Sequence, residues 1–531
     1  MTISPLAIKE YLSKARDDFL WLKTRTAAEI KAELDAVRPA PDTSGLMKHQ
    51  LIGLFLGIAY PAFSFWYGMG IGKTLMTLRL AEYWFDLGQL RKAVVLVPSN
   101  EAVYTWGDEI RKWKIMLPFV ELDDSSSYDK AERMLMMDHG LVIVSYPGLT
   151  RMVTTKEPEV KKKKETGKNV LKPQRQALDI LCAGLDAMIL DESTEVANTE
   201  SLAYRIALAI SKRVPIRYAL AGRPYGRDPF DLWPQQFLID HGESLGTTQG
   251  IFREGFFEKK KSYFGGPYSF DFKFDKTKTA QLAQFSGHRS MSYADDECAD
   301  LPPKTQIVRR IPFPKETLVY YDKVVEHLIA SRGDQQVVHN DFIRMRQLSS
   351  GFLGVVSDEF GAKVEIEFKH NPKLDVLLEL LKQVPLGRKS VVFFEFIHSG
   401  KTLSAALKKA KIKHSWIWSG AKNRKEQMDC FRDDPECEVL LLNHQIGAYS
   451  LNLQHANYVF VYESPVGCVD RAQMDKRCWR TGQTLHVTIT DLVMIDSVDE
   501  RILEFHKEGA ELFASMRRSP TLFRREKGTL L

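Results

Sequence analysis

The 531-residue chain is long enough for two to four domains, and a hydrophobic content of 44% is enough to bury several cores. Its 74 cationic and 68 acidic side chains leave a net charge of only +6, so a nucleic-acid partner would need a local basic surface. The six cysteines show neither zinc-ligand nor disulfide-framework spacing, and no apolar run suits a signal peptide or a membrane span. These properties exclude a membrane protein and a small disulfide-rich protein, and they predict an intracellular globular protein without a membrane partner.

The predicted elements divide the chain into five parts. Residues 1–40 read as a polar amphipathic helix that the break RPAPDTSG ends. In residues 41–240 the apolar runs AVVLVP, GLVIVSY, DAMILDE and RYALAG alternate with helical stretches, which is typical of a parallel sheet covered by helices. Residues 372–499 repeat this alternation with KSVVFFEF, EVLLLN, NYVFVYE and VTITDLV, residues 241–371 lack such strands, and residues 500–531 read as a helical tail. The sequence therefore predicts an α/β protein with two parallel-sheet lobes and a mostly helical insertion between them.

The stretch TTKEPEVKKKKETGKNVLKPQR, residues 154–175, is strongly charged and lies inside the first predicted lobe. It contains eight Lys or Arg residues and three Glu residues, and we predict a loop here. The sequence leaves open whether this loop is only a solvated excursion or a segment that touches DNA.

The stretch YGMGIGKT, residues 67–74, follows an apolar run and precedes a stretch with helical spacing. This is the strand, loop and helix context of a phosphate-binding loop, in which Gly70 and Gly72 let backbone N–H groups approach phosphate oxygens. Lys73 would neutralise the β and γ phosphates, and Thr74 would bind Mg²⁺. Tyr67 replaces the first glycine of the strict pattern, so the motif alone is weak.

An acidic pair supplies the complement of this loop. In AMILDEST, residues 187–194, an apolar strand delivers Asp191 and Glu192 to its carboxyl end. Asp191 is suited to hold Mg²⁺ and Glu192 to polarise an attacking water, although an acidic pair at a strand end is common by itself. The loop and the pair, in this order within one lobe, predict a nucleoside triphosphatase.

The stretch QMDKRCWRTGQ, residues 473–483, spaces Gln473, Arg477 and Arg480 so that a helix would align all three on one face. An exposed helix can carry such residues as solvated charge. A triphosphatase, however, needs cations that stabilise the transition state, and an arginine from a second lobe makes hydrolysis depend on domain closure. We therefore interpret Arg477 and Arg480 as arginine fingers.

The order of these motifs resembles that of helicase superfamily two, specifically the Swi/Snf-type family of DNA translocases, from about Leu46 to Ile502. LMKHQLIGL is similar to the adenine-reading Q motif, with Gln50 as its glutamine, and VVLVPSNEAVYTWGDEIRKW is similar to motif Ia, with its characteristic Trp106 and Trp113. Gln473 aligns with motif VI, which implies that it binds nucleotide. Other stretches in family order are DESTEVANTES, LAGRPYGRDPFDLW, LPPKTQIVRRIPF, NPKLDVLLELL, SVVFFEF and IGAYSLNLQHANYVFVYESP.

Several positions depart from the family pattern. The substituted residues are Gly68, Ser193, Thr194, Arg223, Arg227, Ala448 and Ser450. They lie in motifs that connect hydrolysis to DNA in the family, whereas the predicted catalytic Lys, Thr, Asp, Glu and two Arg are all present.

The resemblance implies two RecA-like lobes, ATP and Mg²⁺ as cofactors, and an ATP-dependent translocase that binds double-stranded DNA independently of its sequence. It is closest to a minimal phage or bacterial motor, which implies the cytoplasm of a bacterium or infected host, or the nucleus if the source is eukaryotic. One alternative is a strand-separating or fork-remodelling helicase, although no segment resembles a strand-splitting hairpin. Another is a nucleotide-gated DNA-binding protein with slow ATPase activity, which Thr194 and Arg223 make plausible.

Three segments are candidates for a DNA groove by family position: PSN after the motif Ia strand, SYPG after the next strand, and Ser450 to Asn452. Ordinary turn chemistry is the alternative for each. The tryptophans at 416, 418 and 479 are interpreted as packing residues rather than base-stacking platforms.

Overall fold

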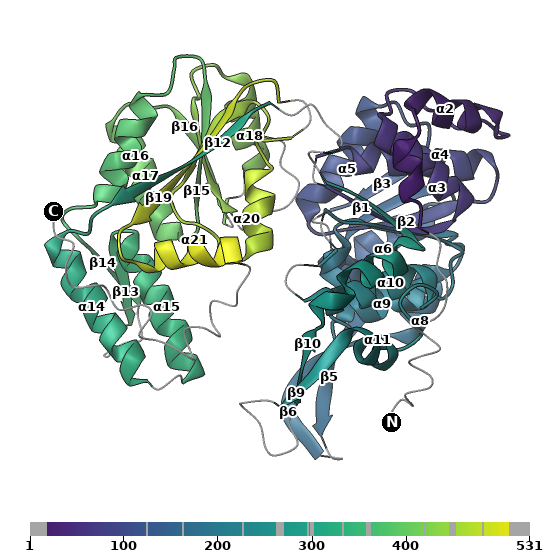
Figure 1. The fold of residues 1–531 in the computed structure, drawn as a ribbon, viewed down its shortest axis with the longest axis horizontal. Coiled ribbons are helices and arrows are strands. Elements are labelled where there is room, and N and C mark those ends of the chain that lie inside the picture. Colours follow the sequence, from purple (N-terminus) through teal and green to yellow (C-terminus); the bar gives the residue numbers. More distant parts are fainter. Residues whose placement is uncertain are drawn as a thin grey trace. The chain divides into compact units, whose positions relative to one another are not determined.

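The computed structural model describes residues 18–508 apart from short segments, namely 69, 124–125, 162–163, 223, 226–227, 262–269, 295–296, 298–301, 332–333, 357–362, 419, 422, 445–452 and 481–482. The chain forms two compact units, Met1–Asp300 and Leu301–Leu531, and each is built on a parallel sheet (Figure 1). The two predicted α/β lobes are therefore present. The division between the units falls inside the predicted insertion, residues 241–371.

A seven-stranded parallel sheet forms the centre of the first unit, in the order β11-β1-β8-β7-β2-β4-β3. Its strands are β1 (Ala62–Tyr67), β2 (Lys92–Val97), β3 (Phe119–Leu122), β4 (Gly140–Ser145), β7 (Ala187–Leu190), β8 (Ile216–Leu220) and β11 (Ser290–Tyr293). The four apolar runs predicted for this lobe are β2, β4, β7 and β8. The edge strand β3 was not predicted, because only its last residue is fully buried and it lacks a continuous apolar run.

Helices cover both faces of this sheet, and each face has its own apolar cluster. One cluster includes residues of η1 (Leu20–Thr24), α2 (Ala27–Ala36), α3 (Lys48–Ala59), α4 (Lys73–Asp86) and α5 (Asn100–Lys112). The other includes residues of α6 (Ser127–Met136), α7 (Tyr146–Val153), α8 (Arg175–Cys182), η2 (Ser193–Val196), α9 (Leu202–Ser211), α10 (Leu232–Asp240), α11 (Gln249–Phe256) and α12 (Thr279–Gly287). The short helices η3 (Pro229–Asp231) and η4 (Lys276–Lys278) complete the unit. A helix predicted near the N-terminus is present as α2, which a capping box formed by Thr26 and Glu29 begins; residues 1–17 lie outside the described chain.

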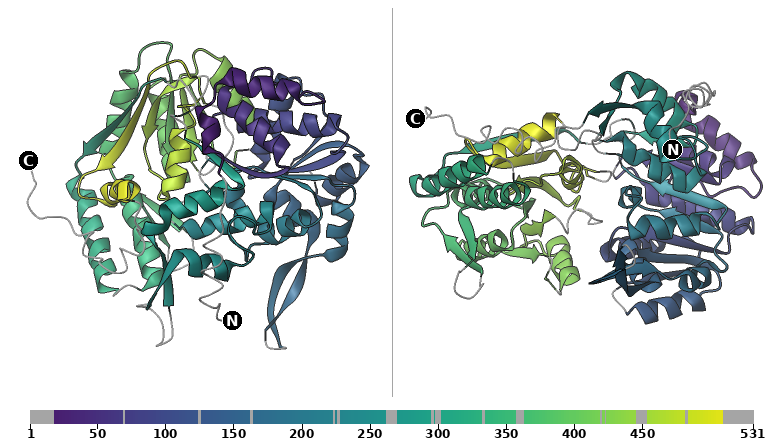
Figure 2. Two further views of the ribbon diagram at one scale, coloured as in Figure 1. Left: turned by 45° about the vertical axis from the view of Figure 1, so that its right-hand side comes forward. Right: turned by 90° about the horizontal axis from the view of Figure 1, so that it is seen from below.

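The charged stretch 154–175 is not the predicted loop. It forms an antiparallel hairpin of β5 (Thr154–Lys161) and β6 (Lys164–Pro173), which extends away from the helices of its unit in Figure 2. A second antiparallel hairpin, β9 (Phe257–Lys261) with β10 (Phe270–Phe274), lies in the predicted helical segment. The lysine run concealed the first hairpin, because charged residues are depleted in strands and mask the pattern.

A six-stranded parallel sheet forms the centre of the second unit, in the order β12-β19-β18-β15-β17-β16. Its strands are β12 (Lys304–Ile311), β15 (Lys389–Phe394), β16 (His414–Ile417), β17 (Val439–Asn443), β18 (Ala456–Val461) and β19 (Val487–Met494). The helices are α16 (Pro372–Lys382), α17 (Ile397–Lys409), α18 (Arg424–Asp433), α20 (Cys468–Asp475) and α21 (Val498–Glu508). The four runs predicted for this lobe are β15, β17, β18 and β19.

The prediction that residues 241–371 lack strands is wrong. β11 extends the first sheet and β12 extends the second, while α14 (Lys315–Ala330), α15 (Gln335–Ser349) and the hairpin of β13 (Phe352–Val356) and β14 (Lys363–Glu367) follow β12. β12 escaped prediction because most of its side chains are exposed, so it has no buried alternation. A partly buried ion pair of 2.7 Å between Lys373 Nζ and Asp499 Oδ2 joins α16 to α21, and Asp499 also accepts from Ser349 of α15.

No helix in the described part of the chain is both long enough and apolar enough to cross a membrane.

Candidate nucleotide-binding site

The predicted phosphate loop connects β1 to α4 at the carboxyl end of the first sheet. Gly70 and Gly72 have φ values of 77° and 79°, in the left-handed region that favours glycine. Gly72 caps the N-terminus of α4, and a Cβ atom there would lie 2.1 Å from Gln50 Nε2. Both glycines are therefore required by backbone geometry, and the loop presents the N-terminal end of a 14-residue helix, where anions bind.

Helix α3 holds this loop by two side chains. Gln50 Nε2 donates to the carbonyl of Gly72 at 2.9 Å, while Gln50 Oε1 accepts from the N–H of Met47 at 2.8 Å. His49 Nε2 lies 2.7 Å from the carbonyl oxygen of Ile71, so this nitrogen must carry the proton. Burial lowers the pKa of His49, which favours the neutral ring. Gln50, predicted as an adenine contact, is thus also a support of the phosphate loop.

Lys73 begins α4 and its side chain is 9% exposed. Its Nζ donates to the carbonyl of Tyr67 at 2.9 Å and lies 4.0 Å from Glu192 Oε1. The structure therefore brings together the predicted lysine and the predicted acidic pair. Thr74, the next residue, is half-buried at the first turn of the same helix.

Asp191 and Glu192 follow β7, which is separated from β1 by β8 alone. Burial, together with the neighbouring Glu192 carboxylate, raises the pKa of Asp191 to about 6, although Trp106 and Lys73 oppose the rise. Trp106 Nε1 donates to Asp191 Oδ2 at 2.7 Å, and the Tyr146 hydroxyl donates to the Asp191 backbone carbonyl at 3.0 Å. Glu192 has a φ of 46°, an unusual value for a non-glycine residue. Such strain is typical of functional sites.

Asp191 and Ser193 have hydrogen-bond partners that the sequence did not predict. Trp106 was noted only as a family feature, and Tyr146 only as part of SYPG, so neither was predicted to touch Asp191. Ser193 donates to Gln235 Oε1 at 2.7 Å, and both side chains are fully buried. Gln235 Nε2 in turn donates to the carbonyl of Asp231 at 2.8 Å and to that of Pro224. Ser193 therefore ties the acidic stretch to the segment after β8, whereas Arg223 and Arg227 lie outside the described residues.

The helix predicted to align Gln473, Arg477 and Arg480 ends too early. Helix α20 stops at Asp475, so Gln473 is helical and the two arginines follow in a turn. The turn is stabilised because the carbonyl of Arg477 accepts from Leu453 N–H. Gln483 Nε2 also donates to the carbonyls of residues 454, 456 and 478, an amide network that the spacing does not reveal.

Within this second-unit segment, Gln473 and Arg477 are 9% and 7% exposed. No hydrogen-bond partner of Gln473 Oε1 is found among the described residues, which leaves a buried acceptor available for a ligand. The structure thus places Gln473 and Arg477 in a largely buried setting rather than on a solvated face, and Arg480 is half-buried.

Two of the three groove candidates are helix N-termini. Ser99 caps α5 by accepting from Ala102 N–H, and Ser145 caps α7 by accepting from Gly148 N–H. Ser145 Oγ also donates to Asn100 Oδ1 at 2.8 Å, which joins the two segments. The capping roles agree with turn chemistry and leave the DNA role as a prediction; Ser450 to Asn452 lie outside the described residues.

The tryptophans of the second unit have packing contacts. Trp416 and Trp418 stack with ring centroids 5.7 Å apart, and Trp479 Nε1 donates to the carbonyl of Pro302 at 2.8 Å. These contacts agree with their interpretation as packing residues.

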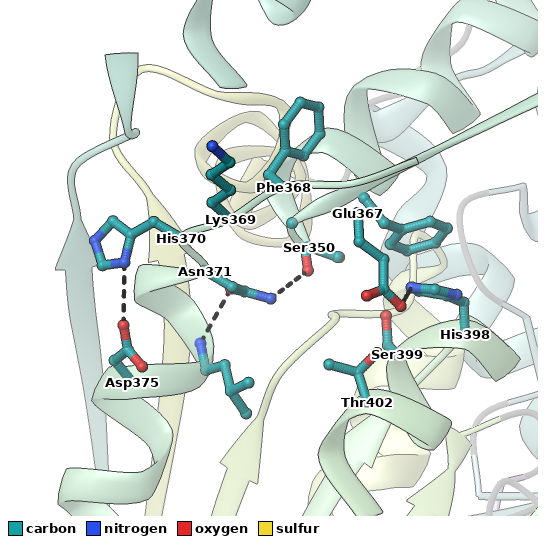
Figure 3. A pocket seen from close by; sticks show the side chains of 13 residues that line it. Ser350, Glu367, Phe368, Lys369, His370, Asn371, Asp375, His398, Ser399 and Thr402 are labelled. Atoms are coloured by element: carbon teal, nitrogen blue, oxygen red, sulfur yellow. Dashed lines mark hydrogen bonds and ion pairs between the residues drawn. The ribbon is translucent and has the colours of Figure 1, made fainter. Parts of the chain in front are cut away.

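A separate cavity of about 250 Å³ lies in the second unit, between the start of α16 and α17 (Figure 3). Asn371 donates to the carbonyl of Ser350 at 3.0 Å at one side, and His398 Nε2 lies 3.3 Å from Glu367 Oε1 at the other. The lining combines the acidic residues Glu367 and Asp375 with the basic residues Lys369, His370 and His398.

Comparison with known proteins identifies two domain patterns. The SNF2-related domain matches residues 67–355, and the helicase conserved C-terminal domain matches residues 372–482. A putative helicase, 172L, of Invertebrate iridescent virus 6 is 22% identical, over 87% of this chain and 88% of its own. A putative protein, p41, of Acyrthosiphon pisum secondary endosymbiont phage 1 is 23% identical, over 83% of this chain and 90% of its own. The Sulfolobus solfataricus SWI2/SNF2 ATPase core, solved in complex with double-stranded DNA, is 18% identical with a TM-score of 0.38, over 90% of this chain and 95% of that one.

Proposed function

The chain belongs to the SNF2-related family of helicase superfamily two and is a DNA-dependent ATPase, and we propose that it is an ATP-dependent translocase on double-stranded DNA. The observation that carries the proposal is the convergence of Lys73, Asp191 and Glu192 at the carboxyl end of the first sheet. Open parallel sheets bind their ligands at this end. The viral and phage relatives support action in the cytoplasm of an infected or bacterial host.

The chemistry of the donors fits Mg²⁺ and a nucleoside triphosphate. A buried carboxylate with a raised pKa, at Asp191, gains from a cation, and the hydroxyl of Thr74 is the second oxygen ligand that such sites use. Asp191 and Thr74 would hold Mg²⁺, which would supply positive charge to neutralise the charge that develops on the phosphates. Lys73 binds the β and γ phosphates, and the loop amides near Gly70 and Gly72 orient them. Glu192 orients the attacking water and accepts its proton.

The second unit supplies the remaining groups in this proposal. Arg477 and Arg480 stabilise the charge on the γ phosphate in the transition state, and Gln473 accepts a hydrogen bond through its buried Oε1. These residues belong to residues 301–531 and the phosphate loop belongs to residues 1–300, so in this proposal both units supply groups for hydrolysis.

DNA is bound through its backbone in this proposal. The half-buried segment Pro98–Asn100 supplies hydroxyl, amide and backbone N–H groups, which bind phosphates without reading bases. Ser145 and Gly148 are buried and hydrogen-bonded, so they support this segment through the hydrogen bond from Ser145 Oγ to Asn100 Oδ1. Affinity should therefore vary little with base sequence and fall steeply with salt, because phosphate contacts release counterions.

Displacement of a third strand tests translocation directly. The substrate is a linear duplex that carries a triplex-forming strand, beside a duplex with a single-stranded tail, and Lys73→Ala serves as the control without hydrolysis. ATP-dependent release of the third strand, with the tailed duplex left intact, supports the proposal. Activation of the ATPase by single strands alone would refute it.

One observation favours a second function, strand separation. The β5–β6 hairpin extends from the first unit (Figure 1), although no segment of the sequence resembles a strand-splitting hairpin. If it separates strands, the wild type unwinds the tailed duplex. Replacing residues 155–172 with a short Gly-Ser linker would then abolish unwinding but retain ATPase activity.

A further inference from the structure

Two buried aromatic side chains hold Asp191 from different sides. Trp106, which is 1% exposed, donates its indole N–H to the carboxylate oxygen Oδ2 at 2.7 Å. Tyr146, which is 3% exposed, donates its hydroxyl to the Asp191 backbone carbonyl at 3.0 Å. One contact sets the direction of the carboxylate and the other fixes the end of β7 that carries it. Hydrogen bonds of this kind orient metal ligands in proteins.

Tyr146 lies in one of the segments predicted above for the DNA groove, and Trp106 lies on the helix that begins in the other. Trp106 lies on α5, seven positions after Ser99, so it shares a helix face with the residue that caps α5. Tyr146 directly follows Ser145, the residue that caps α7. The 2.8 Å hydrogen bond from Ser145 Oγ to Asn100 Oδ1 joins the two segments. Each of the helices α5 and α7 therefore contacts Asp191 through one buried aromatic side chain.

We propose that Trp106 and Tyr146 are positioning residues that make the geometry of Asp191 depend on DNA binding at Pro98–Asn100, to which the hydrogen bond between Ser145 and Asn100 joins α7. The inference rests on the proposed function for the location of DNA. Protein interiors are close-packed, so a displacement of α5 or α7 moves its buried aromatic ring rather than compressing the core. The ring then shifts the carboxylate or the strand end to which it is hydrogen-bonded. DNA would thereby raise the fraction of molecules in which Asp191 is placed to hold Mg²⁺.

The chain offers matched substitutions. Trp106→Phe and Tyr146→Phe each keep a buried ring and remove one donor. Trp113→Phe is the control for the first, because Trp113, the C-cap of α5, donates its indole N–H to Glu109 of the same helix and not to Asp191. Tyr204→Phe is the control for the second, since Tyr204 is a buried tyrosine of the same unit. Tyr146→Phe removes only a hydroxyl, so it keeps the proposal testable if Trp106→Phe fails to fold.

The first measurement is the affinity for ADP, determined by calorimetric titration with and without Mg²⁺. Loss of a hydrogen bond to a charged group predicts that Trp106→Phe weakens Mg²⁺-dependent binding about tenfold or more. Binding without Mg²⁺ and both control variants should match the wild type. Unchanged Mg²⁺ dependence in Trp106→Phe would overturn its positioning role.

The second measurement is coupling, read in two independent ways. Duplex DNA should stimulate ATP turnover less in both test variants than in the wild type. A non-hydrolysable ATP analogue with Mg²⁺ should likewise change duplex affinity less in them, because coupling between two ligands is reciprocal. If duplex DNA and nucleotide remain coupled as in the wild type in both variants, the proposed link between DNA binding and Asp191 is wrong. A wild type that duplex DNA does not stimulate would instead refute the proposed function, and the Mg²⁺ measurement would still decide the role of Trp106.

Discussion

Replacing Gly72 with alanine should disable the phosphate loop through a contact that the structure identifies. The new Cβ would lie 2.1 Å from Gln50 Nε2, far inside van der Waals contact, so the Gln50 carboxamide must move. That movement breaks its hydrogen bond to the Gly72 carbonyl and the one it accepts from Met47. Alanine would also have to adopt a φ of 79°.

The magnitude follows from these losses. Left-handed geometry costs a non-glycine residue about 1–2 kcal/mol, and the two hydrogen bonds contribute about 1 kcal/mol each. Gly72→Ala should thus disfavour the binding geometry of the loop by about 3–4 kcal/mol. In a Gln50→Ala background the contact and both bonds are already absent, so only the φ contribution remains. The coupling between the two positions should be about 2 kcal/mol, or roughly thirtyfold in the apparent Kd for nucleotide.

Calorimetric titration of all four members of this double-mutant cycle with ADP and Mg²⁺ measures the coupling. Gly88→Ala is the control, because Gly88 follows the other end of α4 with a φ of 72° and no atom lies within 4 Å of an added Cβ. It should lower stability without altering nucleotide affinity. If Gly72→Ala weakens binding equally with and without Gln50, the contact does not support the loop and the reasoning fails.

The remaining predictions concern the charged residues. Lys73→Ala should lower the ATPase rate roughly 10³-fold or more with the circular dichroism spectrum unchanged, whereas Glu192→Gln should bind ATP in a filter assay and not turn it over. Arg480→Ala should lower kcat about 10³-fold with a smaller effect on nucleotide affinity. If Arg480→Ala and Arg477→Ala both keep the wild-type DNA-stimulated rate, the two arginines are not arginine fingers. Asp191 has a pKa of about 6 in the fold against an ordinary 3.8, so the native state binds more protons between these values and loses stability as pH rises through them. Asp191→Asn should therefore raise the thermal midpoint of the ligand-free protein at pH 7.5 and have little effect near pH 4, and an equal effect at both pH values would contradict this assignment.

Sequence patterns identify the parts of this fold that are buried and periodic. The central strands of both sheets are continuous apolar runs because helices cover both of their faces. The phosphate loop and Asp191–Glu192 were found for the same reason, because each follows such a strand directly. Local order along the chain therefore predicts both halves of the acidic and phosphate-binding site.

Features that depend on contacts between distant residues were not predictable. The turn that follows α20 is held by Leu453 N–H, which donates to the carbonyl of Arg477, and by the amide of Gln483, which donates to the carbonyls of residues 454 and 456. The partners at 453, 454 and 456 lie outside the motif, so no spacing rule within it contains these contacts. The edge strand β12 is held by pairing with β19, 183 positions further on at its first pair, Lys304 with Val487. The same holds for the two donors to Asp191, which come from helices 85 and 45 positions away.

Burial beside Glu192 destabilises the charged form of the Asp191 carboxylate in the ligand-free fold, and this loss of stability raises the pKa of Asp191. Trp106 and Lys73 offset only part of this loss, since the pKa remains above its ordinary value. A bound cation would offset most of this loss of stability. Binding of nucleotide with Mg²⁺ should therefore stabilise the first unit by more than the contacts of the nucleotide alone imply. The carboxylate and the backbone carbonyl of Asp191 are each held by a buried aromatic donor. In the proposed coupling, small movements of α5 and α7 would therefore reach the predicted Mg²⁺ ligand through these two hydrogen bonds and so control hydrolysis.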